Sequence, residues 1–289
     1  MGHAAALTTI TIWGVTFVST KVLLIDFEPV EILFYRFIIG LIVLMIAYPN
    51  RLKWTGAKQE LMFMAAGLSG VTMYYLLQNI ALTYTTASNV GVITSVGPIF
   101  TALLANWLLD EKKLKVSFFI GFFVAITGIS LISFSGITDL QLNPAGDILA
   151  LIAAVFWAVY SILVKKISEY GYDTIQVTRR IFFYGLVFMT PAFFVFRFNL
   201  GIERFSQPAN IFNILFLGIC ASALCFVTWN SAVKFLGAVK TSVYIYLVPV
   251  ITVAASVIVI NEKITHMMAV GIILTLAGLF ISERKASKP

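Results

Sequence analysis

Charged residues are scarce in this sequence. Only 11% of its 289 residues are Asp, Glu, Lys or Arg, against about 25% in soluble domains, while 60% are apolar. A water-soluble globule of this composition would expose wide apolar patches, so we exclude one and expect lipid as the solvent. The net charge of +7 fits basic loops beside a lipid bilayer. It does not indicate a nucleic-acid partner, because such proteins concentrate Lys and Arg in a polar soluble patch.

Residues that carry catalysis or bind metals are also few. Cys220 and Cys225 lie five positions apart in one apolar stretch, which points them in different directions on a helix and predicts neither a disulfide nor a metal site. The histidines are His3, near the N-terminus, and His266, at the start of the last apolar run. No HExxH pattern, phosphate-binding glycine loop or intramembrane acid pair is present. We therefore expect no metal, no cofactor and no enzymatic activity.

Ten apolar runs occupy most of the chain. A hydrocarbon core about 30 Å thick needs about 20 helical residues, and backbone amides in lipid must bond within their own segment, so each run predicts a transmembrane helix. The runs are Ala4–Ile25, Val30–Tyr48, Leu61–Leu82, Ala87–Leu109, Val116–Ser135, Ile148–Val164, Ile175–Phe196, Ala209–Val233, Thr241–Ile260 and His266–Ser282. The connecting loops are short and leave no room for a soluble domain.

Basic residues near the ends of these runs lie mostly on the side of the N-terminus. That side carries Arg51, Lys53, Lys58, Lys112, Lys113, Lys115, Lys165, Lys166, Lys234, Lys240, Arg284, Lys285 and Lys288. The other side carries only Lys21, Arg197, Arg204 and Lys263. Cytoplasmic loops of membrane proteins hold the excess of Lys and Arg. We therefore expect a multi-pass protein of the cytoplasmic membrane with both termini in the cytoplasm.

The second half of the sequence repeats the first. At an offset of 144, Trp13 matches Trp157, Lys21 matches Lys165 and Arg36 matches Arg180; at 151, Asn79 matches Asn230 and Pro98 matches Pro249. Each copy holds five predicted crossings, and because five is odd the second copy enters the membrane from the opposite face. The predicted fold is all-α, with ten transmembrane helices in two inverted five-helix repeats, residues 1–139 and 140–289. The matching turns at Lys112 and Lys263 are then expected on opposite faces.

Four stretches of sequence match the pattern of a known family. They are TIWGVTFVSTKVLL, EILFYRFIIGL, SVGPIFTALLANWLLDEK and YLVPVITVAASVIVINEK. The chain resembles the EamA-like branch of the drug/metabolite transporter superfamily along its whole length. The resemblance implies a ten-helix transporter of small metabolites, amino acids or drugs, with a central cavity formed mainly by the first, third, fourth, sixth, eighth and ninth helices. Inverted repeats are themselves typical of secondary transporters.

Helical periodicity ranks the residues that could line such a cavity, since positions three and four apart share a face. The predicted substrate-binding wall consists of Trp13, Thr16, Tyr75, Gln78, Asn79, Ser95, Trp157, Tyr160, Asn230 and Tyr246. Because Tyr74 and Tyr75 are adjacent, we expect only Tyr75 to face inward. The alternative for the tryptophans is packing between helices, and for the two asparagines it is interhelical hydrogen bonding. Ser95 and Tyr246 occupy matching positions, so the cavity is expected to be asymmetric.

Prolines and arginines inside the runs are the other notable residues. Pro98 and Pro249 remove a backbone hydrogen bond and are predicted as hinges, with static bends as the alternative. Arg36 and Arg180 lie about six residues inside their helices, where a charge is costly. Each either reaches back to the membrane surface, pairs with a neighbour, or serves the transported solute as a carboxylate-binding or gating residue.

Acidic residues are missing from the middle of every run. Proton-coupled carriers commonly embed one there, so we expect downhill transport, or coupling through an end-placed acid such as Asp147 or Glu31. The predicted function is alternating-access transport of a small amphipathic metabolite, amino acid or drug-like solute, in the export direction. A channel without alternating access is the alternative. Gly121, Gly128, Gly271 and Gly278 predict close helix packing, between the repeats or between protomers of a homo-oligomer.

Overall fold

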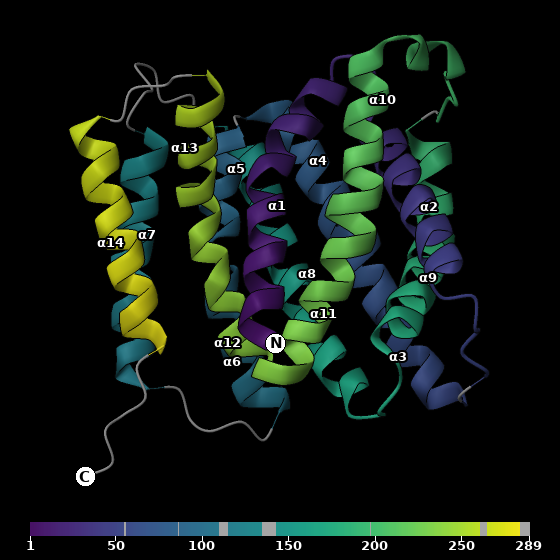
Figure 1. Cartoon of the computed structure of the whole chain (residues 1–289), viewed down its shortest axis with the longest axis horizontal. Coiled ribbons are helices and arrows are strands. Elements are labelled where there is room, and N and C mark those ends of the chain that lie inside the picture. The colour runs from purple at the N-terminus through teal and green to yellow at the C-terminus, as the bar shows by residue number, and fades with distance from the viewer. Residues whose placement is uncertain are drawn as a thin grey trace.

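The computed structural model describes residues 1–54, 56–85, 87–109, 115–134, 143–196, 198–260 and 265–283. Within these ranges the chain forms ten helical rods (Figure 1). In order they are α1 (Gly2–Leu23); α2 (Pro29–Ala47); α3 (Ala57–Gly67), π-helical η1 (Leu68–Met73) and α4 (Tyr74–Tyr84); α5 (Ala87–Thr94) and α6 (Gly97–Leu108); α7 (Val116–Phe134); α8 (Pro144–Ser168); α9 (Thr174–Val195); α10 (Pro208–Leu215), π-helical η3 (Phe216–Leu224) and α11 (Cys225–Leu236); α12 (Ala238–Val243), η4 (Tyr244–Tyr246) and α13 (Leu247–Ile260); and α14 (His266–Glu283). A short helix, η2 (Ile202–Ser206), precedes α10.

Most of these rods are long and apolar enough to cross a membrane. Among the described residues, six meet both criteria, and three shorter apolar helices cover 116–132, 238–251 and 266–282. The one rod outside these two groups is the seventh, α9, which carries Arg179 and Arg180 near its start. The predicted ten-helix, all-α fold is confirmed, and the chain is a multi-pass membrane protein.

Local sequence signals fix several helix ends. The Asn143 side chain accepts hydrogen bonds from the amides of the first turn of α8 at 3.2 and 3.3 Å, and Asp173 does the same for α9. Glu28 and Glu31 form a capping box at the start of α2, where Pro29 occupies the first helical position. Gly237 adopts φ 87° between α11 and α12, a left-handed conformation that favours glycine.

Equivalent rods of the two repeats run in opposite directions. In Figure 1 the third rod runs from α3 at the lower end to α4 at the upper end, whereas the eighth runs from α10 above to α11 below. The fourth rod, α5 to α6, descends, and the ninth, α12 to α13, ascends. The repeats are therefore inverted. The Lys112 and Lys263 turns lie outside the described residues.

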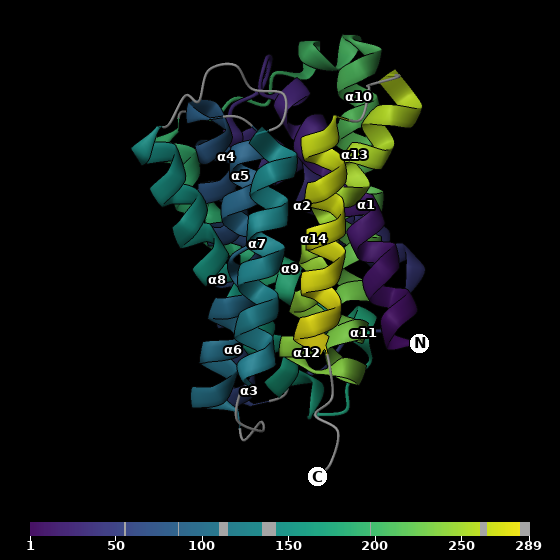
Figure 2. The ribbon, with the colours of Figure 1, turned by 90° about the vertical axis from the view of Figure 1, so that its left-hand side faces the viewer.

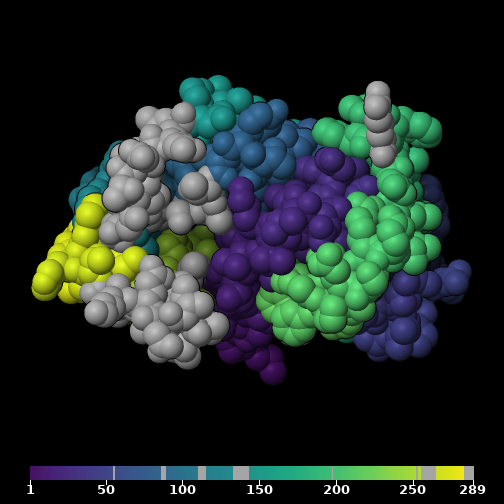
Figure 3. All heavy atoms as spheres, turned by 90° about the horizontal axis from the view of Figure 1, so that it is seen from above, coloured from purple at the N-terminus to yellow at the C-terminus, as the bar shows by residue number. Residues whose placement is uncertain are grey.

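The last rods of the two repeats, α7 and α14, pack along each other (Figure 2). A Cβ atom on Gly121 would lie 2.6 Å from the carbonyl oxygen of Gly278, and one on Gly128 would lie 2.5 Å from that of Gly271. The four glycines thus allow the two backbones to approach closely within one chain. Seen from the upper end (Figure 3), the molecule is elongated, with α14 at one extremity and the η2–α10 region toward the other.

Candidate substrate cavity

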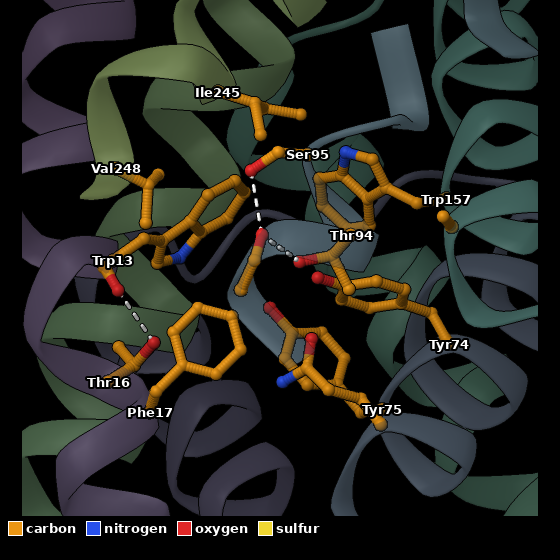
Figure 4. A pocket seen from close by; sticks show the side chains of 13 residues that line it. Trp13, Thr16, Phe17, Tyr74, Tyr75, Thr94, Ser95, Trp157, Ile245 and Val248 are labelled. Atoms are coloured by element: carbon orange, nitrogen blue, oxygen red, sulfur yellow. Dashed lines mark hydrogen bonds between the residues drawn. The ribbon is translucent and has the colours of Figure 1, made fainter. Parts of the chain in front are cut away.

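A narrow cavity lies between the repeats (Figure 4). Its wall consists of Trp13, Thr16, Phe17, Tyr74, Tyr75, Gln78, Gly91, Thr94, Ser95, Ala154, Trp157, Ile245 and Val248. These residues come from α1, α4 and the α5–α6 rod of the first repeat and from α8, η4 and α13 of the second. Trp13 and Trp157 lie near the middle of their helices, which places the cavity near the membrane midplane. Its volume is about 40 Å³, room for about three water molecules, so it must widen to admit a metabolite.

Six residues of the predicted wall meet at this cavity, namely Trp13, Thr16, Tyr75, Gln78, Ser95 and Trp157. They come from four different rods. In each rod, residues spaced three or four apart on one face of the helix were predicted to face the cavity, and these six do. The sequence did not single out Phe17, Thr94, Ala154, Ile245 or Val248. Apart from Thr94, these residues are apolar and resemble ordinary packing residues in sequence.

The two tryptophans at matching positions face each other across the repeat boundary. The ring centroids of Trp13 and Trp157 are 5.2 Å apart, in an edge-to-face arrangement at 77°. The indole of Trp13 donates a hydrogen bond to the carbonyl oxygen of Ala221 at 3.0 Å, so this donor is already used. Trp229 packs beside both, with centroids 5.2 and 5.5 Å away. Both repeats therefore contribute an aromatic ring to the wall, and Trp229 supports the two rings.

Tyr74 also lines the cavity, so the expectation that it faces away from Tyr75 was wrong. Its ring lies 4.7 Å from that of Trp157 and 4.7 Å from that of Tyr75. Consecutive residues on a helix are about 100° apart, and the α4 surface meets the cavity over a wide enough arc to place both rings there. Figure 4 shows the two tyrosines side by side at one edge of the wall.

Gln78 differs from the other polar residues of the wall. The hydroxyl groups of Thr16, Thr94 and Ser95 donate to backbone carbonyl oxygens of their own rods at 2.7 to 2.9 Å, as the dashed lines of Figure 4 show for Thr16 and Ser95. The Gln78 side chain is 4% exposed, and its Oε1 atom has no hydrogen-bond partner among the described residues. An unpaired buried amide is costly, and here it borders the cavity.

Four residues of the predicted wall lie elsewhere, because they make contacts between helices. The amide nitrogen of Asn79 donates to the carbonyl oxygen of Pro29 at 3.2 Å. The hydroxyl of Tyr160 donates to Asn230 at 2.7 Å, and Asn230 donates to Thr178 at 2.9 Å. Tyr246 is fully buried in an apolar cluster with Phe118 and Phe122 among others. The bonding between helices that was the alternative for both asparagines is the arrangement observed.

The two prolines mark matching breaks in the fourth and ninth rods. Pro98 is the second residue of α6, directly after the turn that separates it from α5. Pro249 is the third residue of α13, directly after η4. Both therefore occupy a first helical turn, where the missing amide costs no internal hydrogen bond. Ser95 and Ile245, which line the cavity, lie at these breaks.

Arg36 and Arg180, the two arginines predicted as gates, have different surroundings. Arg36 is 1% exposed, so it does not reach the membrane surface. Its Nε atom donates to the Ser222 hydroxyl at 3.0 Å, its guanidinium lies 4.1 Å from the ring centroid of Tyr75, and its Nη2 atom has no partner in the described part of the chain. Arg180 instead bonds the carboxylate of Glu60 and the carbonyl oxygen of Leu52.

The sequence matches one protein family over most of its length, at residues 1–134 and 144–283, and that family is described as the EamA-like transporter family. The chain belongs to the EamA-like transporter family. An uncharacterized transporter of Archaeoglobus fulgidus is 29% identical over 98% of this chain and 97% of its own length. A probable terminal-alkyne amino-acid exporter of Streptantibioticus cattleyicolor is 25% identical over 97% and 93%. A crystal structure with a TM-score of 0.77 at 18% identity covers 98% of this chain and 96% of the other, which shows the shared fold.

This EamA-like chain is a transporter and not an enzyme. Within the residues that the structure describes, no three His, Cys, Asp or Glu side chains gather in a way that could hold a metal ion. The described cysteines are both free, and Cys225 is buried.

Two ion pairs join the repeats of this EamA-like transporter at opposite ends, and we call them the upper and lower clamps. In the upper clamp Arg204, before α10, bonds Glu31 of α2 at 2.6 Å. This hydrogen bond raises the pKa of Arg204 above its usual value. In the lower clamp Arg180 of α9 bonds Glu60 of α3, whose carboxylate also accepts a hydrogen bond from Tyr184 at 2.6 Å. Both glutamates are buried, and both clamps are closed in this structure.

Proposed function

We propose that this transporter moves a small amphipathic solute, such as an amino acid, a related metabolite or a drug-like molecule, by alternating access across the cytoplasmic membrane. One observation carries the proposal: residues of two inverted repeats converge on one cavity near the midplane, and Gln78 in its wall has an Oε1 atom without a hydrogen-bond partner among the described residues. Two halves of similar structure can exchange conformations and open one site to each side in turn. The start of α1 and the end of α14 lie at the same end of the molecule (Figure 1), which we assign to the cytoplasm from its excess of Lys and Arg.

The wall supports an amphipathic solute. Trp13, Trp157 and the two tyrosines supply flat apolar surfaces, and Gln78 supplies hydrogen-bonding capacity. Arg36 lies directly beneath Tyr75 and has no carboxylate partner in the described part of the chain. We assign Arg36 to binding a carboxylate of the solute, reached when the Tyr75 ring turns aside. The relative described as a probable amino-acid exporter supports both this class of solute and the export direction.

Opening of the cavity requires the clamps to break alternately. Breaking the Glu31–Arg204 pair frees the upper ends of α2 and α10, and breaking the Glu60–Arg180 pair frees the lower ends of α3 and α9. We assign Pro98 and Pro249 to the hinges, because each follows a break in its rod beside a residue of the wall. A channel would need no such exchange between the two ends.

Transport by the protein in reconstituted vesicles tests the proposal. Amino acids, nucleosides and quaternary amines are screened as radiolabelled solutes, and an unlabelled solute trapped inside should accelerate uptake of the labelled one. Such counterflow together with saturation indicates a carrier, whereas a channel shows linear uptake without counterflow. Absence of both for every solute that crosses would contradict alternating access.

The variant Trp13→Ala tests the site itself. It removes one aromatic wall and should lower transport efficiency about tenfold while the protein still folds, since an aromatic contact contributes about 0.5 to 1.5 kcal/mol beyond the apolar area that it buries. Trp107→Ala is the matched control, because Trp107 is 80% exposed on α6 and should leave transport unchanged. Equal kinetics of the two variants would remove Trp13 from the binding site.

A further inference from the structure

A second pocket lies at the lower end of the molecule, remote from the central cavity. It has a volume of about 330 Å³ and is formed where the end of α2, the following loop and the start of α9 meet. Leu41, Met45, Arg51, Leu52, Gln176, Arg179, Arg180, Phe183 and Tyr184 line it. α2 packs against α9, and both lie at the side of the bundle away from α14 (Figure 1). The pocket thus opens on the periphery of the protein.

The polar end of the pocket carries more positive than negative charge. Arg51, Arg179 and Arg180 line it, and Glu60 neutralises Arg180. Arg179 donates to the carbonyl oxygens of Tyr48 and Asn50 at 2.7 and 2.5 Å, which carry no charge to balance it. Neither Arg51 nor Arg179 belongs to an ion pair within the described ranges. Two guanidinium groups therefore lack a counter-ion in one pocket.

The hydrogen bonds of Arg179 fasten the loop after α2 to α9. This structural role does not require a positive charge. The matching residue in the first repeat, 144 positions earlier, is Tyr35. Its hydroxyl donates to the carbonyl oxygen of Leu200, and so ties its own helix to a loop at the opposite end of the molecule. A neutral side chain performs that structural task there. The positive charge at Arg179 is an addition found at one end only.

The other end of the pocket is apolar and reaches toward the lipid. Met45 and Phe183 are 43% and 51% exposed, as expected for side chains that face acyl chains. At 1.5 Å per residue, Met45 and Leu41 lie about 3 and 9 Å from the end of α2. The pocket therefore extends from the depth of lipid headgroups into the hydrocarbon region, with arginines at the first depth and apolar side chains at the second.

We propose that this pocket binds one anionic glycerophospholipid, with its phosphate at Arg51 and Arg179 and an acyl chain along Leu41, Met45 and Phe183. Guanidinium groups bind phosphate oxygens in a bidentate geometry, and basic pockets between helices at the cytoplasmic side of a membrane are suited to anionic headgroups. The apolar half of the pocket gives no advantage to a free phosphate, so the ligand is the whole lipid. Binding there ties the end of α2 to α9, next to the lower clamp.

Lipid titration of the purified full-length protein in detergent tests this site independently of the transported solute. Phosphatidylglycerol should raise the melting temperature in a saturable way and bind as one molecule per chain by native mass spectrometry. Phosphatidylcholine with the same acyl chains should do neither. Arg51→Gln should weaken phosphatidylglycerol about fivefold, since one basic group near the surface contributes about 1 kcal/mol, and Arg51→Gln/Arg179→Gln should weaken it further.

The double variant Lys165→Gln/Lys166→Gln is the matched control, since it removes two charges at the same end outside this pocket. It should bind phosphatidylglycerol like the unmodified protein. Equal weakening by both double variants, equal effects of the two lipids, or full stabilisation by inorganic phosphate or glycerol 3-phosphate would overturn the proposal. If Arg179→Gln does not fold, Arg51→Gln decides alone, because Arg51 is exposed.

Discussion

Arg36 and Arg180 occupy the same position in the two repeats, yet they have different partners. Arg180 lies at the lower end with a carboxylate and a backbone carbonyl. Arg36 is fully enclosed, with one serine hydroxyl and the face of Tyr75. Duplication has therefore preserved the position of the charge while its counter-ion has diverged. The same sequence position therefore carries a charge paired with a carboxylate in one repeat, and in the other a charge that has no carboxylate partner among the described residues.

The third rods of the repeats differ in a related way. Gln78 matches Trp229 at the offset of 151, and both carry a buried polar atom without a partner among the described residues. Gln78 borders the cavity, while Trp229 packs behind Trp13 and Trp157. The first repeat thus contributes most of the hydrogen-bonding capacity of the wall, and the second contributes mainly apolar surface. Solute specificity should accordingly be more sensitive to changes in the first repeat.

Removal of the lower carboxylate should have the largest effect on stability. Glu60→Ala leaves the Arg180 guanidinium without its carboxylate, and breaking a buried pair costs about 3 to 5 kcal/mol. Because the Arg180 side chain is 18% exposed, we expect about 3 kcal/mol, near the lower limit. Unfolding in mixed detergent and dodecyl sulfate micelles measures the change.

Arg36→Met is the comparison for that experiment, because it removes the matching charge where no carboxylate is lost. It should change the free energy of unfolding by less than about 1 kcal/mol, since replacing a buried charge by an apolar residue is often neutral. Adding Arg180→Met to Glu60→Ala should recover most of the loss. An equal cost for Glu60→Ala and Arg36→Met would show that the two arginines have equivalent surroundings after all.

Gln78→Leu should have an intermediate effect, and on transport only. Loss of one hydrogen bond to the solute should raise KM about tenfold, equivalent to about 1.4 kcal/mol. The melting temperature should not fall, because the Oε1 atom of Gln78 has no partner among the described residues to lose. Trp229→Phe, at the matching position, should change KM less. A loss of stability with unchanged KM would instead assign Gln78 a packing role.

Tyr246→Phe should have the smallest effect. The Tyr246 hydroxyl is buried without a partner in the described part of the chain, so its removal should raise the free energy of unfolding by up to about 1 kcal/mol. Ser95→Ala at the matching position should lower it by about 0.5 kcal/mol, because the Ser95 hydroxyl bonds Gly91 at 2.7 Å. Thermal melts of both variants measure the two signs. Changes of the same sign would contradict the asymmetry of the two positions.

The ten helices and their inverted arrangement could be predicted, because the length of each apolar run and the odd number of runs in each repeat can be read directly along the sequence. Part of the inward faces of α1, α4 and α8 could be predicted from a single helical period, but that period placed Tyr74 outward and Asn79 and Tyr160 inward, which the cavity lining contradicts. The partners of Asn79 and Asn230 could not, since Pro29 and Thr178 belong to other helices. The pairing of Arg180 with Glu60 depends in the same way on tertiary packing.

The π-helical segments also have a consequence for motion. Adding 151 to residues 68–73 gives 219–224, which lie within η3, so the third rods of both repeats are underwound at the same level. A π-turn amounts to one extra residue in a helix, and moving it along the rod rotates the residues that it passes by about 100°. The stretch with Thr72 can then stay fastened to Gly185 of α9 while Tyr74, Tyr75 and Gln78 swivel. In each repeat, such a shift would reorient a short stretch of the third rod without turning the rest of it.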